Sequence, residues 1–260
     1  MVAFNTKHPK HKMSLVEMLS AKFGDDALAR ALVQVKRSST LTPESKEIAT
    51  KLKNWSNWKR DTFSVAKASD LQRAQFSQWL ANDVQPKSVL LMLKGDDTVA
   101  NITTYLRTLN RYVEEYNTKN PTAQASLLRT LSRQYSEADV AKALVTAKQY
   151  RGTESIATKL ETELLTGWLE SGKSVDDVFK RLQLLNEGRL ELTSRKVEVS
   201  EDYTRLFNRE KPGLETLFKT LTNVFNDDGK LATVLVQAKD NRRSAVKATW
   251  LQKRTIQSVA

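Results

Sequence analysis

ALARALVQVK, at residues 27–36, is the stretch that decides the fold, because the chain contains three versions of it. It returns as DVAKALVTAK at 139–148 and as KLATVLVQAK at 230–239. In each version apolar residues recur at i, i+3, i+4 and i+7, the spacing of one face of an α-helix. A helical phrase repeated along a chain predicts a repeat array, in which each unit buries its apolar face against a neighbour. We expect the i+4 leucines to lie in the core: Leu32, Leu144 and Leu235.

A second kind of block lies between these L-type blocks. WLANDVQPKSVLLMLKG (79–95) parallels WLESGKSVDDVFKRLQL (168–184), and RYVEEYNTKNP (111–121) parallels DYTRLFNREKP (202–212). The two offsets are 89 and 91, so the period is about 90 residues, within the size of a compact module. These W-to-Y blocks make two further pairs of equivalent residues, which we expect to be buried: Trp79 with Trp168, and Tyr112 with Tyr203.

The composition agrees with an all-α chain. Among 260 residues there are only eight glycines and five prolines, while good helix formers are abundant. Cysteine is absent, which excludes disulfides and thiolate chemistry. No apolar run approaches the roughly 20 residues that span a bilayer, so we expect no membrane partner. We therefore predict an all-α fold, a tandem repeat of small helical bundles stacked end to end into an elongated rod.

The blocks divide the chain into six segments. They are a basic tail (1–13), L-type helices (14–60), a first W-to-Y bundle (61–121), L-type linker helices (122–165), a second W-to-Y bundle (166–212) and terminal L-type helices (213–260). Since the same blocks recur in the same order, we expect successive units to pack alike.

Catalytic chemistry finds little support in the residues. The two histidines, His8 and His11, lie in the basic tail, so no Ser–His or Cys–His pair is expected. The acidic pairs mostly stand beside Gly or Ser at expected helix starts, where capping and the helix dipole explain them. No glycine-rich phosphate loop occurs. We expect no enzyme activity, no catalytic or metal site, and no cofactor.

The net charge of +12 raises a nucleic-acid alternative. The basic residues are spread along the chain, but several fall on the terminal L-type block, where one helical face could bind a phosphate backbone. A solvated helix surface would show the same pattern. The residues of this alternative are Arg242, Arg243, Lys247, Lys253 and Arg254.

An extra stretch interrupts the first repeat. Leu52 and Trp79 are 27 positions apart, whereas the matching Leu160 and Trp168 are 8 apart. Departures from a repeat are where recognition specific to one unit tends to lie. The stretch supplies three candidate partner-binding residues, Trp55, Trp58 and Arg60, although the two tryptophans would equally suit continued packing of the first helix.

The alternation of L-type helices with W-to-Y blocks resembles the WY and LWY tandem-repeat effectors of plant-pathogenic oomycetes, the RXLR-type effectors. The resemblance rests on the blocks at 79–95 and 168–184, on the tyrosine segments ending in proline, and on the L-type blocks, and it covers about residues 14 to 260. It implies that Trp79 pairs with Tyr112 and Trp168 with Tyr203, each pair closing a helical bundle.

The same resemblance implies a function. It suggests a non-catalytic virulence effector or adaptor that binds a host plant protein and redirects its activity to suppress immunity. Family members suggest phosphatase scaffolds, trafficking complexes or silencing components as partners. Secretion by the pathogen and translocation into the host cytoplasm or nucleus would follow. Neither a secretion signal nor an Arg-x-Leu-Arg motif stands before the first L-type block. Either a leader has been removed, which agrees with a start so close to that block, or the resemblance is to the fold alone.

Overall fold

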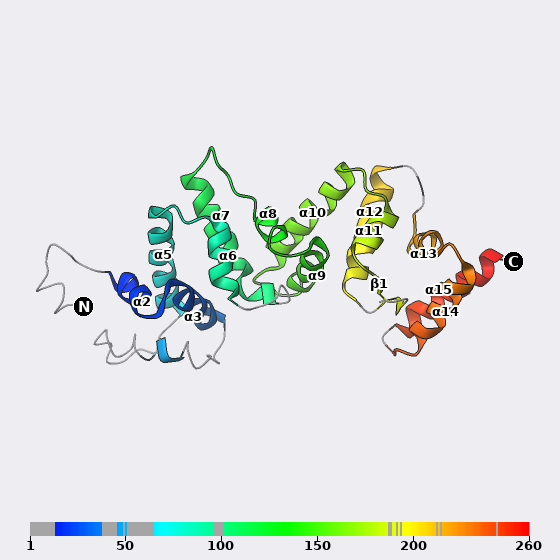
Figure 1. The fold of residues 1–260 in the computed structure, drawn as a ribbon, viewed down its shortest axis with the longest axis horizontal. Coiled ribbons are helices and arrows are strands. Elements are labelled where there is room, and N and C mark those ends of the chain that lie inside the picture. The colour runs from blue at the N-terminus through cyan, green and yellow to red at the C-terminus, as the bar shows by residue number, and fades with distance from the viewer. Residues whose placement is uncertain are drawn as a thin grey trace, which may run out of the picture. The chain divides into compact units, whose positions relative to one another are not determined.

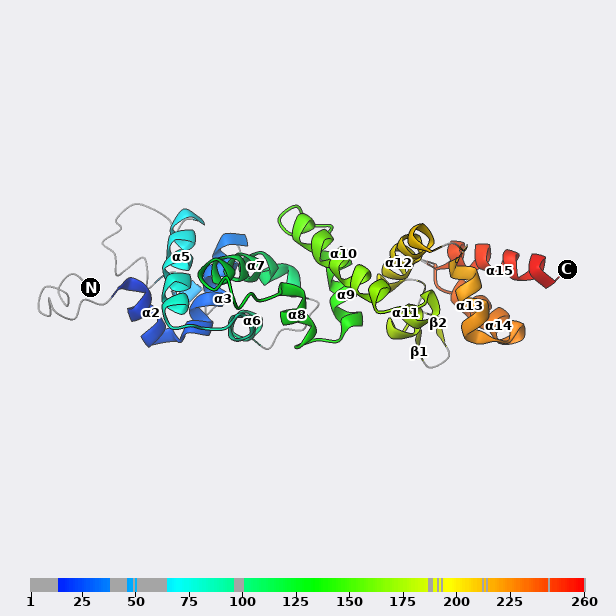
Figure 2. The same ribbon diagram turned by 90° about the horizontal axis from the view of Figure 1, so that it is seen from above.

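A computed structural model describes two compact units, Met1–Leu131 and Ser132–Ala260. The described residues are 14–37, 46–48, 50, 65–95, 101–186, 189–190, 192, 194–211, 213, 215–242 and 244–259. Figures 1 and 2 show that most of them are helical, with turns and loops between the helices. The predicted all-α repeat architecture is confirmed within these ranges. The six-segment division is finer than the two compact units and stays a prediction.

The first unit is built from two L-type helices and a W-to-Y bundle. Its helices are α2 (Leu15–Phe23), α3 (Asp25–Arg37), α5 (Val65–Ala81), α6 (Pro86–Lys94), α7 (Ile102–Lys119) and α8 (Leu127–Ser132), the last reaching the division between the units. Helix α3 packs on α2, α5, α6 and α7. Its buried face carries Leu28 and Leu32, which belong to one hydrophobic cluster with residues of α2 and α5.

The second unit repeats the plan and adds a terminal L-type block. Its elements are α9 (Glu137–Ala147), α10 (Glu154–Glu170), α11 (Val175–Arg181), β1 (Leu185–Asn186), β2 (Arg189–Leu190), α12 (Lys196–Glu210), α13 (Leu217–Phe225), α14 (Asp228–Lys239) and α15 (Ala245–Val259). Helix α12 packs on α9, α10 and α11, while α14 and α15 pack on each other. A short antiparallel pair, β1 with β2, is the only strand pairing among the described residues.

Local signals in the sequence place the helix starts. Ser14 and Ser174 each form a capping box: the side chain accepts from the third helical N–H, and an acidic side chain there accepts from the cap N–H. These reciprocal bonds satisfy amides that the helix leaves unpaired. In the second box the hydrogen bonds from Ser174 hold the pKa of Asp177 below its ordinary value. Pro86 begins α6, where its missing N–H costs nothing.

Candidate functional site

Each W-to-Y bundle is closed by a buried aromatic pair. In the first, Trp79 is 1% exposed and Tyr112 is fully buried, with ring centroids 5.7 Å apart in an edge-to-face arrangement. Phe76 contacts both rings, stacking on Trp79 at 5.8 Å and meeting Tyr112 edge to face at 5.2 Å. The Tyr112 hydroxyl donates a 2.6 Å hydrogen bond to the carbonyl of Val84, in the turn between α5 and α6. The pair thus ties α7 to the α5–α6 turn.

The second bundle reproduces this geometry. Trp168 is 4% exposed, Tyr203 is fully buried, and their rings lie 6.1 Å apart, again edge to face. The Tyr203 hydroxyl donates a 2.6 Å hydrogen bond to the Lys173 carbonyl between α10 and α11. Burial raises the pKa of both tyrosine hydroxyls, Tyr112 and Tyr203. Both hydroxyls therefore remain donors at neutral pH, and the pairs are structural.

The two bundles differ at the indole nitrogen. Trp168 Nε1 donates a 2.9 Å hydrogen bond to Glu137, whose carboxylate also pairs with Arg181 at 2.8 Å. Trp79 Nε1 is buried and has no acceptor within the described part of the chain. Packing alone therefore holds Trp79, whereas a hydrogen bond also orients Trp168.

Two further duplicated contacts were not predicted from the sequence. The Asn117 amide makes a two-way clamp on the backbone of Ala125, at 2.9 and 2.7 Å, and Asn208 clamps Glu215 in the same way, at 2.8 Å in both directions. The two asparagines are 91 residues apart, so they occupy equivalent positions when the two tyrosine segments of the sequence are aligned. Each clamp fixes the loop that leads from the tyrosine helix into the next L-type block.

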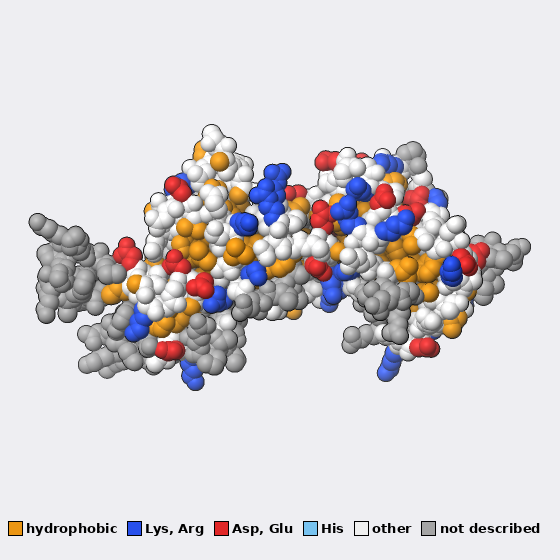
Figure 3. Space-filling model, viewed as in Figure 1, with side chains coloured by type: hydrophobic (Ala, Val, Ile, Leu, Met, Phe, Trp, Pro, Cys, Tyr) orange, Lys and Arg blue, Asp and Glu red, His pale blue; other side chains and the backbone are white. Residues whose placement is uncertain are grey.

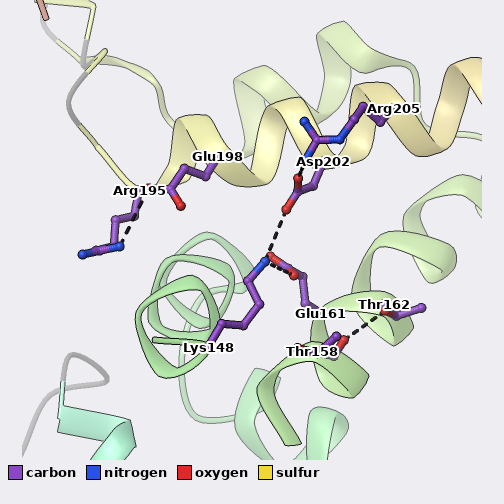
Figure 4. A network of polar contacts seen from close by, with 8 residues as sticks. All are labelled: Lys148, Thr158, Glu161, Thr162, Arg195, Glu198, Asp202 and Arg205. Carbon is purple, nitrogen blue, oxygen red and sulfur yellow. Dashed lines mark hydrogen bonds and ion pairs between the residues drawn. The ribbon is translucent and has the colours of Figure 1, made fainter. Parts of the chain in front are cut away.

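The most enclosed ion pairs among the described residues form a network within the second unit (Figure 4). Lys148, at the end of α9, lies 2.5 Å from Glu161 on α10 and 3.3 Å from Asp202 on α12. The Glu161 side chain is 7% exposed, the lysine 26% and the aspartate 22%. On the outer side, Arg205 also pairs with Asp202. One cation therefore joins three helices.

Opposing effects set the protonation of this network. Burial lowers the pKa of Lys148, but the hydrogen bond and charge of Glu161, with Asp202, outweigh it and raise that pKa overall. Burial raises the pKa of Glu161 above its ordinary value, even though Lys148 acts against it. Lys148 is thus a firmly protonated cross-link, a role that suits packing of α9, α10 and α12 rather than proton transfer.

The residues singled out from the sequence fall in three environments. Leu32, Leu144 and Leu235 are buried, as are the four aromatic residues of the two pairs. The candidate partner-binding residues Trp55, Trp58 and Arg60 lie outside the described residues, as do Arg243, His8 and His11. Within the described ranges no group of three or more His, Asp or Glu side chains is arranged to hold a metal ion.

The basic residues of the terminal block are mostly exposed. Arg242, Lys253 and Arg254 are exposed on or beside α15, whereas Lys247 pairs with Glu201 of α12 at 2.5 Å. On the face shown in Figure 3, basic and acidic side chains are interspersed. Among the described helices, none combines the length and apolarity needed to cross a membrane. The exposed basic residues of the terminal block therefore lie on or beside one helix, and the described side chains of the face in Figure 3 form no continuous positive field.

Exposed apolar side chains are the remaining binding candidates. The large ones are Leu91 (42% exposed), Tyr150 (50%), Val236 (49%), Val246 (83%) and Trp250 (49%). Three of these five belong to α14 and α15, next to the basic cluster. The sequence did not single out Val246 or Trp250, because helical periodicity alone does not say which apolar residues remain uncovered.

Duplicated bundles, duplicated clamps and a core committed to packing define a helical repeat scaffold, a class of protein that works through its exposed surface. No family model matches the chain. It is 40% identical over 190 residues to an RxLR effector protein from Phytophthora infestans (strain T30-4), covering 71% of this chain and 27% of that protein. It is 28% identical over 231 residues to the RxLR effector protein PSR2 of Phytophthora sojae, covering 86% of this chain and 30% of PSR2.

A solved structure agrees with these relatives. The crystal structure of PcRxLR12 superposes with a TM-score of 0.66 at 25% identity, covering 98% of this chain and 57% of that one. The chain is a homologue of Phytophthora RxLR effector proteins, and the family predicted from the sequence is confirmed. The chain spans between 27% and 44% of the length of the first three relatives.

Proposed function

We propose that the chain is a non-catalytic virulence effector, an adaptor that binds a host plant protein and redirects its activity to suppress immunity. Its relationship to proteins named RxLR effectors carries the proposal. The two closed bundles support it, because a scaffold held by buried aromatic pairs presents its surface with little ordering cost on binding. Family resemblance adds delivery into the host cell, in the cytoplasm or nucleus, and partners such as phosphatase scaffolds, trafficking complexes or silencing components.

The pKa values of the described residues also agree with the adaptor hypothesis. The shifted pKa values among the described residues belong to buried tyrosines, to the Lys148–Glu161 pair and to the helix-capping Asp177 and Asp227, all of which serve packing or helix capping.

The test is affinity purification of the tagged chain from plant-cell extract at physiological salt, with and without nuclease. A stoichiometric host protein that survives nuclease, together with suppressed immune output in leaves expressing the chain, is the expected result. Loss of every partner on nuclease treatment would instead favour the nucleic-acid alternative. Ser155→Ala, on the exposed side of α10, serves as the control for a surface substitution in the same purification, because it leaves both aromatic pairs intact.

A further inference from the structure

Helix α15 carries an exposed stripe of three residues, one turn apart. Val246 is 83% exposed, Trp250 is 49% exposed, and the Arg254 guanidinium lies 4.8 Å from the Trp250 ring centroid. Positions i, i+4 and i+8 share one face of a helix. Ala248 and Leu251 are fully buried, so the helix is anchored by another face. We call Val246, Trp250 and Arg254 the α15 stripe.

The repeat supplies an internal reference for this helix. The buried Thr153 hydroxyl, before α10, donates a 2.8 Å hydrogen bond to the Ala147 carbonyl. The buried Ser244 hydroxyl, before α15, donates a 2.5 Å bond to the Ala238 carbonyl. Both bonds span six residues and lie 91 positions apart, which matches the offset of the tyrosine segments. Helices α10 and α15 are therefore equivalent, residue for residue, at this offset.

At the equivalent positions α10 carries polar residues. Ser155, Lys159 and Glu163 correspond to Val246, Trp250 and Arg254, and all three are exposed. The equivalent face of α10 is thus exposed, even though α10 is followed in the chain by the helices of a W-to-Y bundle. Packing between repeats does not account for the α15 stripe.

Val236 of α14 is also exposed, but it lies on a different kind of surface from the α15 stripe. Its counterparts in the earlier copies, Val33 and Val145, are 6% and 1% exposed. Val236 therefore lies on the face that packs within the repeat, and it is separate from the α15 stripe. Of these two helices, α15 carries an aliphatic and an aromatic side chain where α10 carries Ser155 and Lys159.

The charge of the helix has also been inverted. Helix α10 carries four glutamates and one lysine, whereas α15 carries three basic residues and no acidic residue. Arg242 is exposed just before α15. Within the described part of the chain, neither Arg242, Lys253 nor Arg254 forms an ion pair, while Lys247 is occupied by Glu201. The stripe is therefore flanked by positive charge that is available to a partner.

We propose that the α15 stripe is a docking surface for an acidic amphipathic segment of a host protein, in which apolar anchors are flanked by Asp or Glu. This inference rests on the proposed function and assigns it a surface. Trp and Arg are the residue types that most often dominate binding energy at such contacts. The basic flank supplies charge complementarity, which orients the segment and speeds its association.

A nucleic acid fits the stripe less well. Phosphate binding would use the basic residues, but it gives no role to Val246, which is the most exposed large apolar side chain described. The Arg254 guanidinium also covers one face of the Trp250 ring, where a base would stack. The combination of an aliphatic residue, an aromatic residue and cations matches a peptide with both apolar and acidic side chains.

The repeat itself provides the variant that tests the proposal. V246S/W250K/R254E writes the α10 residues onto α15, and because the same fold position tolerates them, the chain is expected to remain folded. Circular dichroism and the melting temperature check this. A library of random 12-residue peptides displayed on phage is panned on the wild-type chain after depletion on the triple variant. Selected peptides are then synthesised, and their affinities are measured by fluorescence polarisation.

The expected result is enrichment of peptides that combine apolar residues with Asp or Glu, and that bind the triple variant at least tenfold more weakly than the wild type. Enrichment without acidic residues, equal affinity for both proteins, or no enrichment would overturn the proposal. A second variant, V246S/W250K, keeps every native cation. If a labelled 20-nucleotide RNA binds the wild type and this double variant equally well, while no peptide is enriched, the surface is a nucleic-acid site instead.

Two further measurements separate this surface from its alternatives. If the wild type sediments as a dimer and the triple variant as a monomer, a second copy covers the stripe and the proposal is overturned. If the triple variant still captures the host protein found with the wild type, the proposed function stands and the surface assignment fails. If neither protein captures a host partner, the proposed function itself fails.

Discussion

Replacing Trp79 with alanine tests the bundle core most directly. The side chain is 1% exposed and contacts the rings of Phe76 and Tyr112. A buried aromatic side chain removes roughly 150–250 Å² from water, which at about 25 cal/mol/Å² corresponds to roughly 4–6 kcal/mol. Part of that area is already covered in the unfolded chain, so we expect a loss of about 3–5 kcal/mol in the free energy of unfolding.

The assay must resolve the two compact units, because a single two-state fit does not describe units that unfold separately. Amide hydrogen exchange read by mass spectrometry does so: α5, α6 and α7 should lose protection, while α10, α11 and α12 keep it. Urea denaturation followed by circular dichroism gives the overall change in stability.

Trp250→Ala is the matched control, since the same side chain is removed from a half-exposed site. By the same area arithmetic its change should be about half as large, roughly 1–3 kcal/mol, and so clearly smaller than that of Trp79→Ala. Trp168→Ala should act on the second unit as Trp79→Ala acts on the first. Losses below about 1 kcal/mol at both Trp79 and Trp168 would refute the core assignment.

Three other predictions follow from the hydrogen bonds and charges. Tyr112→Phe and Tyr203→Phe should each lower the free energy of unfolding by about 1–2 kcal/mol in urea denaturation, because a carbonyl in the turn loses its hydrogen-bond donor. An unchanged stability in both variants would contradict the role of the hydroxyls in closing the bundles. Ser244→Ala should cost about 1 kcal/mol and loosen the α14–α15 turn in hydrogen exchange, and unaltered exchange there would count against it. Lys148→Met should cost roughly 3 kcal/mol at pH 7, since it leaves the Glu161 carboxylate buried without its cation. Burial already holds the pKa of Glu161 above its ordinary 4.5, so proton uptake by Glu161 favours the folded state of the variant, and the loss of stability should shrink as pH falls from 7 to 5. Denaturation curves at the two pH values that give an equal loss would disprove this coupling. The control is K148M/E161L, which lacks the titrating carboxylate.

Residue pairs that recur at a fixed offset were accessible from the sequence. Trp79 with Trp168 and Tyr112 with Tyr203 were visible because each sits in a block whose neighbours also repeat. The asparagine clamps at Asn117 and Asn208 share the same offset, so a closer alignment would have found them. Their hydrogen bonds would still have been unknown, since a side chain that reaches a loop backbone leaves no periodic trace.

The sequence by itself determined the helical repeat, its period of about 90 residues and the identity of its core, because apolar spacing and Trp–Tyr recurrence are properties of the chain alone. Only the tertiary structure decided which apolar residues stay uncovered. Val145 and Val236 are the same residue type at equivalent positions of two L-type blocks, yet one is 1% and the other 49% exposed. The Lys148 cross-link likewise joins residues 13 and 54 positions away. Burial and charge pairing depend on which helices pack together, and that is fixed only when the whole unit folds.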